Sequence, residues 1–385
     1  MAIFLSFKEV WRNKGRFFLF SLVIALITVL VLFISALSEG LALANKQYLE
    51  KLNAQLLVFQ QNVELSANTS RIGLTKLNDI KRVEGVKDAG PIGFSNGTII
   101  FNDGRENLNV SLIGVEAGKP GAPPVIEGEN IILDRGSDVI IDENVAKQSG
   151  VEIGDQIVVK TIQGTKEEFY PLNVIGLTDE RQYLFQPSIF LPYRTWEQIR
   201  PQSSSQGTNL VETTSNVVAV EANLDEEIPA LADKIASQVA NVEVADIETA
   251  YKSIPGYKVQ QSTLNTQRSF TLLIGLLVIG GFFQIQMLQK IPQIGVLKAI
   301  GVSNRIVAGA VVTQIILVTS FGVLLGILAT FLLALGIPNS VPIVFNLSSM
   351  ATAVITLLLI GPIGGLVSVR LAVSVEPLIA LGLSS

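Results

Sequence analysis

The spacing of long apolar runs along the chain is its most informative pattern. The runs from Phe17 to Leu37 and from Ser269 to Gln289 each contain twenty-one residues and no charge, enough for a helix to cross a hydrocarbon core. A further sixty-four residues, Ile306 to Val369, carry no charged side chain. Because two prolines and a Gly/Asn pair interrupt this run over 336–342, it predicts two spans, 306–335 and 350–369, with a short outer loop at 336–349.

Between the first two runs, residues 38–267 alternate between short β-rich runs and amphipathic helices, with Gly, Asn and Asp at the turns. This alternation predicts one large α+β domain. The fold class is therefore a membrane protein with four transmembrane α-helices and an α+β extracytoplasmic domain between helices 1 and 2. The expected strands are 55–60, 97–101, 139–142, 156–160 and 217–221, and the expected helices include 143–149 and one that contains Leu74 and ends near Gly85.

Two further helical patterns lie in this domain. Leu224, Ile228, Leu231, Ile235 and Val239 follow a helical period, and we expect the acids at 225–227 to occupy the first turn of that helix, where its dipole favours negative charge. The helical period of the first span continues outward through Leu41, Ala44, Tyr48 and Leu52, which predicts a stalk. Its counterpart, 257–268, is polar and is a weaker stalk candidate.

The distribution of charge predicts the orientation of the chain. The leader 1–16, the link 290–305 and the tail 370–385 together hold eight bases and two acids, whereas 38–267 holds nineteen bases and thirty-one acids. Because Lys and Arg near span ends are retained on the cytoplasmic side, we expect both termini inside a bacterial plasma membrane and the large domain outside, in the periplasm.

The amino terminus allows two interpretations. A cleaved signal peptide would use the small residues Ala42-Leu43-Ala44, but the apolar run is longer than the roughly 7 to 15 residues of such signals. The alternative is a retained span with an amphipathic leader, in which Ile3, Phe7 and Val10 lie on one helical face along the inner membrane surface. A plain positively charged anchor remains open beside the amphipathic leader.

Composition excludes several classes of chemistry. The chain contains no His and no Cys, which removes Ser/His and Cys/His catalysis, thiol redox chemistry and His- or Cys-based zinc sites. A phosphate-binding loop is also missing, since Gly118-Lys119 is followed by Pro120. Acid pairs at 142–143, 167–168 and 179–180 have no spaced calcium-loop pattern, and we interpret them as solvated surface. No catalytic residue, metal site or nucleic-acid partner is predicted.

The link between the second and third spans, 290–304, is short yet carries a helical pattern of its own. Pro292 suits a first helical turn and Gly301 suits the left-handed position after a helix end. Between them, Ile294, Leu297 and Ile300 are expected on one side. The link could be a helix resting on lipid, or it could dock onto another protein; the residues alone leave both open.

Three stretches resemble one family. Residues 294–301, Ile-Gly-Val-Leu-Lys-Ala-Ile-Gly, are similar to the coupling segment of FtsX/MacB-type ABC transporter permeases. Residues 369–381 resemble the closing pattern of these permeases, and 139–157 resemble a stretch of their extracytoplasmic domain. Two departures stand out: Gln293 replaces the usual acid before the Ile-Gly pair, and no ATPase domain is fused, as in the DevC-like permeases.

The resemblance implies a non-catalytic permease subunit that transmits the motion of a separate ABC ATPase dimer to the outer domain, for export of a lipid, lipoprotein, peptide or drug-like substrate. ATP and Mg²⁺ would be bound by the ATPase, and this chain would need no cofactor. Implied partners are a second copy of the chain, membrane lipids, and a periplasmic adaptor with an outer-membrane channel. The residues assigned to ATPase coupling are Ile291, Pro292, Gln293, Ile294, Gly295, Leu297, Lys298, Ala299, Ile300 and Gly301.

Small residues within the spans predict close helix contacts, either inside one chain or between two copies. The glycines concerned are Gly275, Gly280, Gly281, Gly322, Gly326, Gly361 and Gly365. Three alternative functions remain: an FtsX-like regulator of a cell-wall hydrolase, a lipoprotein-releasing subunit, and a membrane-anchored sensor without an ATPase.

Overall fold

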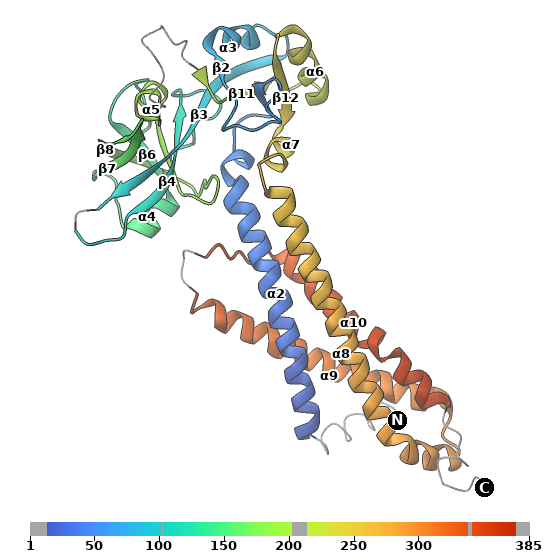
Figure 1. The fold of residues 1–385 in the computed structure, drawn as a ribbon. Coiled ribbons are helices and arrows are strands. Elements are labelled where there is room, and N and C mark those ends of the chain that lie inside the picture. The colour runs from blue at the N-terminus through green and yellow to red at the C-terminus, as the bar shows by residue number, and fades with distance from the viewer. Residues whose placement is uncertain (1–13, 102, 202–213, 338–340, 375–385) are drawn as a thin grey trace. The chain divides into compact units, whose positions relative to one another are not determined.

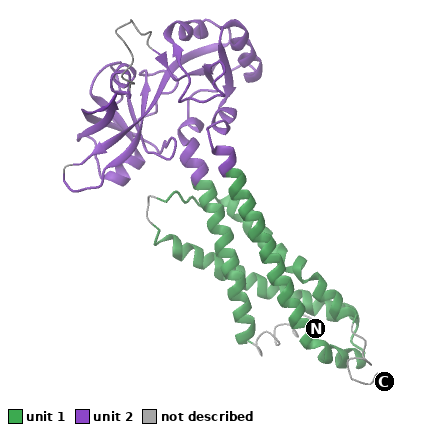
Figure 2. Ribbon diagram, viewed as in Figure 1, with its two compact units in different colours: residues 1–40, 261–385 green, residues 41–260 purple. Residues whose placement is uncertain are grey.

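The structure is a computed structural model that describes residues 14–101, 103–201, 214–337 and 341–374. It divides into two compact units, residues 1–40 with 261–385 and residues 41–260, which Figure 2 shows in different colours. Nearly all of the predicted leader, and the tail beyond residue 374, lie outside the described residues. The first unit contains the predicted spans and the second the predicted α+β domain.

Four long helices form the first unit: α2 (Lys14–Glu50), α8 (Tyr257–Ala299), α9 (Asn304–Ala334) and α10 (Leu347–Ser374) (Figure 1). Each is long and apolar enough to cross a membrane, so the four predicted transmembrane helices are confirmed. The predicted stalk residues up to Glu50 continue α2, and Leu52 follows its end. The helices pack around one buried apolar cluster that includes Phe17 and Leu32 of α2, Phe283 and Met287 of α8, Ile315 of α9 and Leu357 of α10.

The prediction of a separate helix after the second span is wrong. Helix α8 continues through the link to Ala299, with Pro292 inside it rather than in a first turn. A proline in a helix interior has no N–H to donate and its ring crowds the preceding turn, which bends a helix. Figure 1 shows the last part of α8 running in a different direction from the rest. The second span and the segment resembling a coupling helix are therefore one bent helix.

The second unit is built on a ten-stranded mixed sheet in the order β12-β1-β11-β3-β4-β9-β6-β8-β5, with β7 joining β3 and β8. The β4–β9 and β6–β8 pairs are parallel. The main strands are β1 (Leu56–Gln60), β3 (Val86–Ile100), β4 (Leu108–Val115), β6 (Asp138–Asp142), β7 (Gln156–Gln163), β8 (Lys166–Thr178), β9 (Ser188–Pro192), β11 (Val217–Ala222) and β12 (Val242–Asp246), with two-residue strands β2 (Ile72–Gly73), β5 (Glu127–Gly128) and β10 (Thr214–Ser215).

Within its described residues this unit also has five short helices: α3 (Leu74–Lys81), α4 (Glu143–Ser149), α5 (Tyr193–Ile199), α6 (Ile228–Gln238) and α7 (Ile247–Lys252). The predicted α+β class is confirmed. The expected start of α6 is wrong, because the helix begins at Ile228 and the acids at 225–227 precede it. Pro229 lies in the first turn of the helix, where backbone N–H groups have no partner within the helix, so its missing N–H costs no hydrogen bond. Leu224, expected on the buried face of this helix, is fully exposed.

Strand β3 is much longer than the predicted 97–101. Its first half was not predicted because it contains Gly90, Pro91 and Gly93, and glycine and proline are uncommon in strands. The glycines have a packing reason. Gly93 and Gly114 face each other in the β3–β4 pair, and a Cβ on Gly114 would lie 2.6 Å from Cβ of Trp196. The buried indole of Trp196 lies against this glycine pair and donates to Ser95 Oγ at 2.9 Å.

Candidate coupling site

Helix α8 ends in a hydrogen-bonded turn at Gly301. Gly301 has φ +99°, the left-handed conformation expected from the sequence. The Gly301 N–H donates to the Lys298 carbonyl at 2.9 Å, and the Val302 N–H donates to the Leu297 carbonyl at 3.1 Å. This pair of bonds is the Schellman arrangement, which satisfies the last carbonyls of a helix. Helix α9 then begins at Asn304, so the connection between α8 and α9 is short.

One side of the segment 291–301 faces the helix bundle. Ile294 is 7% exposed and belongs to the buried cluster of the four helices, and Gly295 beside it is buried. Lys298, one turn further on, donates from Nζ to the carbonyl oxygen of Val373 at 2.5 Å, in the last turn of α10. Ammonium groups stabilise such helix ends because the last carbonyls lack partners within the helix. Ile294 and Lys298 therefore attach the segment to the bundle.

The other side of the segment is exposed and largely apolar. Val296 is 43%, Leu297 36% and Ile300 77% exposed, and Gln293 is exposed beside them. These four residues recur at the spacing of one helical face, and we call them the coupling surface. The expectation that Ile294, Leu297 and Ile300 share one side is wrong, since Ile294 points into the bundle and Val296 takes its place on the exposed side. Of the other predicted coupling residues, Pro292 and Ala299 are exposed and Ile291 is half-buried.

The part of α8 just before the segment is tied to two other helices. The Arg16 guanidinium of α2 donates to Gln289 Oε1, and Lys290 Nζ donates to Gln314 Oε1 of α9 at 3.0 Å. Lys290 Nζ also lies 5.9 Å from the ring centroid of Phe17. With the Lys298 contact to α10, the end of α8 is attached to each of the three other helices. Gln314 was missed in the sequence, although a lone amide inside an apolar run is a signal for a buried polar contact.

Six of the seven predicted packing glycines line contacts between pairs of helices, and Gly281 does not. A Cβ on Gly322 or Gly326 of α9 would lie 2.7 Å from Ile24 Cβ or from Thr28 Cγ2 of α2. On α10, Gly361 and Gly365 lie against Thr319 and Ile315 of α9. On α8, Gly275 lies against Ile27 of α2, and Gly280 lies against Gly364 of α10. Gly364 was not among the predicted packing glycines. Gly281 has no atom within 4 Å of its Cβ position.

The acid pairs of the second unit are structural. Glu167 pairs with Lys160 at 3.0 Å, Asp179 with Arg181 at 2.6 Å and Glu180 with Lys147 at 2.8 Å. Asp142 is fully buried, so its interpretation as solvated surface is wrong; it caps α4 by accepting from the Val145 N–H at 2.9 Å. Burial raises the pKa of Asp142 to about 6, although backbone donors such as Val145 oppose the rise. Among the described residues no cluster of three or more acids could hold a metal ion.

Comparison with known proteins identifies the family. The profile of the MacB-like periplasmic core domain matches residues 17–238, and that of the FtsX-like permease C-terminal region matches residues 269–377. The chain is an ABC transporter permease of the FtsX/MacB type. Its coupling surface lies within the FtsX-like part of this permease and Asp142 lies within the MacB-like part.

Relatives resemble this permease over half to nearly all of its length. A protein named as hemin transport system permease HrtB, from Staphylococcus haemolyticus, is 25% identical over 98% of this chain and 99% of its own. The macrolide export protein MacB of Psychrobacter cryohalolentis is 23% identical over 74% of this chain and 44% of its own. Among solved structures, the extracellular domain of YknZ from Gram-positive bacteria is 17% identical, covering 50% of this chain and 98% of its own with a TM-score of 0.35.

Proposed function

We propose that this permease works with a separate ABC ATPase subunit, whose motion is received at the segment 291–301 and passed through the helix bundle to the outer domain. In this arrangement both termini lie in the cytoplasm of a bacterial cell and the MacB-like domain lies outside its plasma membrane. The bias of Lys and Arg toward the leader, the link and the tail supports that orientation.

The observation that carries the proposal is the division of the segment into two sides. Val296, Leu297 and Ile300 are exposed in a link whose neighbours Lys290 and Arg305 are charged, a position expected at the membrane boundary rather than in lipid. Apolar side chains in water favour a partner that covers them. On the opposite side, Ile294 and Lys298 attach the segment to the bundle. A protein docked on the exposed side would therefore move the helices as well as the segment.

We further propose that two copies pair through α2 and α8. Both helices carry exposed apolar faces, with Leu26 of α2 63% and Leu277 of α8 65% exposed. Gly281 of α8 is half-buried and has open space at its Cβ position, which permits close approach of another helix. Lipid would cover whatever part of these faces a second copy leaves exposed.

Export of an amphipathic substrate is the transport role that the relatives favour. The full-length relatives named as hemin transport permeases make hemin the first candidate to test, ahead of lipids, lipoproteins, peptides and drug-like molecules. Cells that lack this permease should then accumulate more hemin and grow less well in its presence. A change in cell-wall cleavage without any change in hemin content would favour the regulatory alternative.

The coupling surface can be tested by copurification from mild detergent. We expect tagged permease to retain an ATPase subunit, and Leu297→Asp or Ile300→Asp to remove it, because an apolar residue at the centre of an interface contributes about 2 kcal/mol or more, a loss of about 30-fold in affinity. The matched control is Leu224→Asp, at a fully exposed position of the outer domain. Retention of the ATPase by both coupling variants would refute the assignment of this surface.

A further inference from the structure

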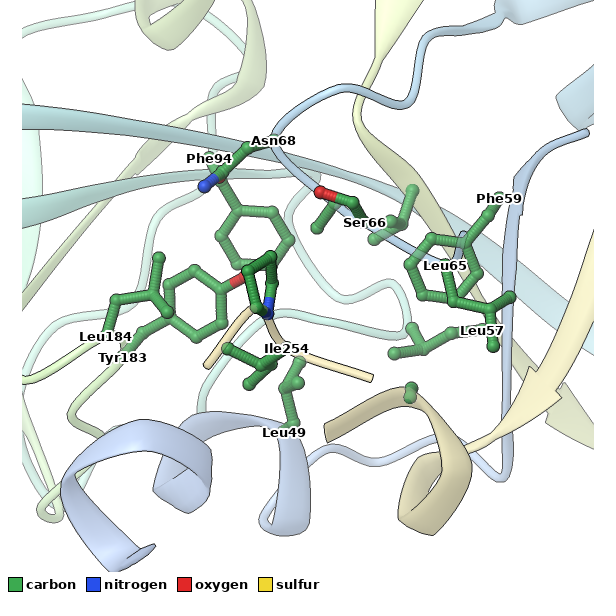
Figure 3. A pocket seen from close by; sticks show the side chains of 14 residues that line it. Leu49, Leu57, Phe59, Leu65, Ser66, Asn68, Phe94, Tyr183, Leu184 and Ile254 are labelled. Atoms are coloured by element: carbon green, nitrogen blue, oxygen red, sulfur yellow. The ribbon is translucent and has the colours of Figure 1, made fainter. Parts of the chain in front are cut away.

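The apolar pocket of the second unit shown in Figure 3 is too small for a ligand. Its internal space is about 20 Å³, and because a cavity needs roughly 10–15 Å³ to hold one water, it has room for one or two water molecules. Leu65 and Leu184, which line it, both have the left-handed backbone conformation that strains a non-glycine residue. A surface that can bind a partner lies instead on the β7–β8 hairpin of this unit.

The hairpin of β7 and β8 has one buried face and one face toward solvent. The buried face carries Ile157, Val159 and Leu172, which belong to one apolar cluster. Because successive side chains of a strand point to opposite faces, the alternate positions form the solvent face. These positions are Gln156, Val158, Lys160 and Ile162 of β7 and Glu167, Phe169, Pro171 and Asn173 of β8.

Four apolar side chains lie together on the solvent face. Ile162 is 57% and Phe169 53% exposed, and they are diagonal neighbours because Ile162 pairs with Glu167, two residues before Phe169. Pro171, the next residue of β8 on this face, is exposed and pairs with the half-buried Val158. A solvated sheet face is normally polar, and a continuous apolar patch on such a face indicates an interaction surface. We call Val158, Ile162, Phe169 and Pro171 the hairpin patch.

The charges beside the hairpin patch indicate which partner suits it. Lys160 and Glu167 are the charged positions among the eight on the solvent face, and they pair with each other at 3.0 Å. The segment 38–267 as a whole holds nineteen bases and thirty-one acids, so two copies of this domain repel each other over most of their surface. On the hairpin the charges balance. A two-fold contact brings the same face of both copies together, so its one Lys and one Glu meet equal numbers of opposite charges.

We propose that the hairpin patch binds the same patch of a second copy of this chain and so joins the two MacB-like domains directly. Sheets pack face to face with their side chains interdigitated, and aromatic residues such as Phe169 are enriched at the centres of protein interfaces. A strongly basic partner would find its charge complement elsewhere on this acidic domain rather than on a balanced face. The proposal rests on the pairing of two copies proposed above and adds a contact outside the membrane helices.

Disulfide crosslinking tests this contact without background, because the chain contains no cysteine. Membranes that contain the full chain with Phe169→Cys or Ile162→Cys are oxidised with copper phenanthroline and analysed on non-reducing gels. We expect a disulfide-linked dimer several-fold more abundant than with Leu224→Cys, a fully exposed position of the same domain. Adding Phe169→Asp to the Ile162→Cys chain should lower the dimer several-fold, since it places like charges across the contact, whereas adding Leu224→Asp should not.

A parallel variant separates this contact from the pairing of the membrane helices. Leu277→Cys, at a position of α8 that is 65% exposed, reports pairing through that helix. A dimer with Leu277→Cys but with neither hairpin variant would overturn the hairpin contact and leave the helix pairing standing, whereas no dimer with any of the three would overturn both. A hairpin dimer that Phe169→Asp and Leu224→Asp leave equally abundant would reflect chance collision, and crosslinking to a different protein would assign the patch to another partner; either result would also overturn the proposal.

Discussion

Replacing Lys298 with methionine removes the ammonium group that attaches the end of α8 to α10, while the aliphatic stem is kept. The donated hydrogen bond reaches the Val373 carbonyl at 2.5 Å, where the helix itself supplies no donor. A hydrogen bond from a charged donor contributes about 1.5–3 kcal/mol. Its loss lowers the population of the attached arrangement relative to the detached one by a factor of about 10 to 150.

Because this ammonium group contacts α10, we expect Lys298→Met to retain the ATPase subunit but to transport about tenfold less substrate per ATP hydrolysed. The assay is the ratio of transport to ATP hydrolysis in proteoliposomes that contain the permease and its ATPase. Lys298→Arg keeps a charged donor and should recover most of this ratio. An unchanged ratio in Lys298→Met would refute the reasoning. Loss of the ATPase as complete as with Leu297→Asp would instead assign Lys298 to the docking surface.

Two further substitutions test the packing and the electrostatics of the permease. Gly326→Leu should lower the thermal unfolding midpoint, because the new side chain meets Thr28 Cγ2 and the Ala25 carbonyl within 2.8 Å and overpacking costs about 1–3 kcal/mol. Gly336→Leu, at an exposed position just after α9 where the nearest atom lies 3.6 Å from the Cβ position, should leave the midpoint unchanged. The raised pKa of Asp142, about 6 against the usual 3.8, stabilises the folded chain below about pH 4, and this contribution is lost as the pH rises through about 6. Asp142→Asn keeps the helix cap and should therefore reduce the fall in unfolding midpoint between about pH 4.5 and 7.5, and an identical fall in both proteins would contradict the shift.

The four spans and the fold class were predictable because they depend on length and composition. A run of twenty-one uncharged residues has few alternatives to a membrane helix, and a glycine such as Gly301 readily adopts the left-handed conformation that ends a helix. The short helices at 74–81 and 143–149 were also predictable, because their apolar period is local, although the first helix ends at Lys81 and not near Gly85. In each case neighbouring residues alone decide the structure.

Features set by tertiary contacts could not be predicted in the same way. Pro292 is compatible with the first turn of a new helix or with the interior of a bent helix. The structure has the bent helix, in which Ile294 packs into the bundle and Lys298 donates a hydrogen bond to α10. Which side of the segment is exposed likewise depends on where α9 and α10 lie. The strained conformations of Leu65 and Leu184 have no sequence signal at all, because nothing in a leucine predicts a positive φ.

The bonded end of α8 at Gly301 has a consequence for speed. A helix end with unsatisfied carbonyls frays, so a force applied to it can unfold the last turn instead of moving the whole helix. Here the Val302 and Gly301 N–H groups close the last turn and α9 begins at Asn304. Under the proposed coupling, a push on the segment would displace α8 and α9 together without a step of unfolding and refolding, so the rate of the movement would be set by the ATPase subunit.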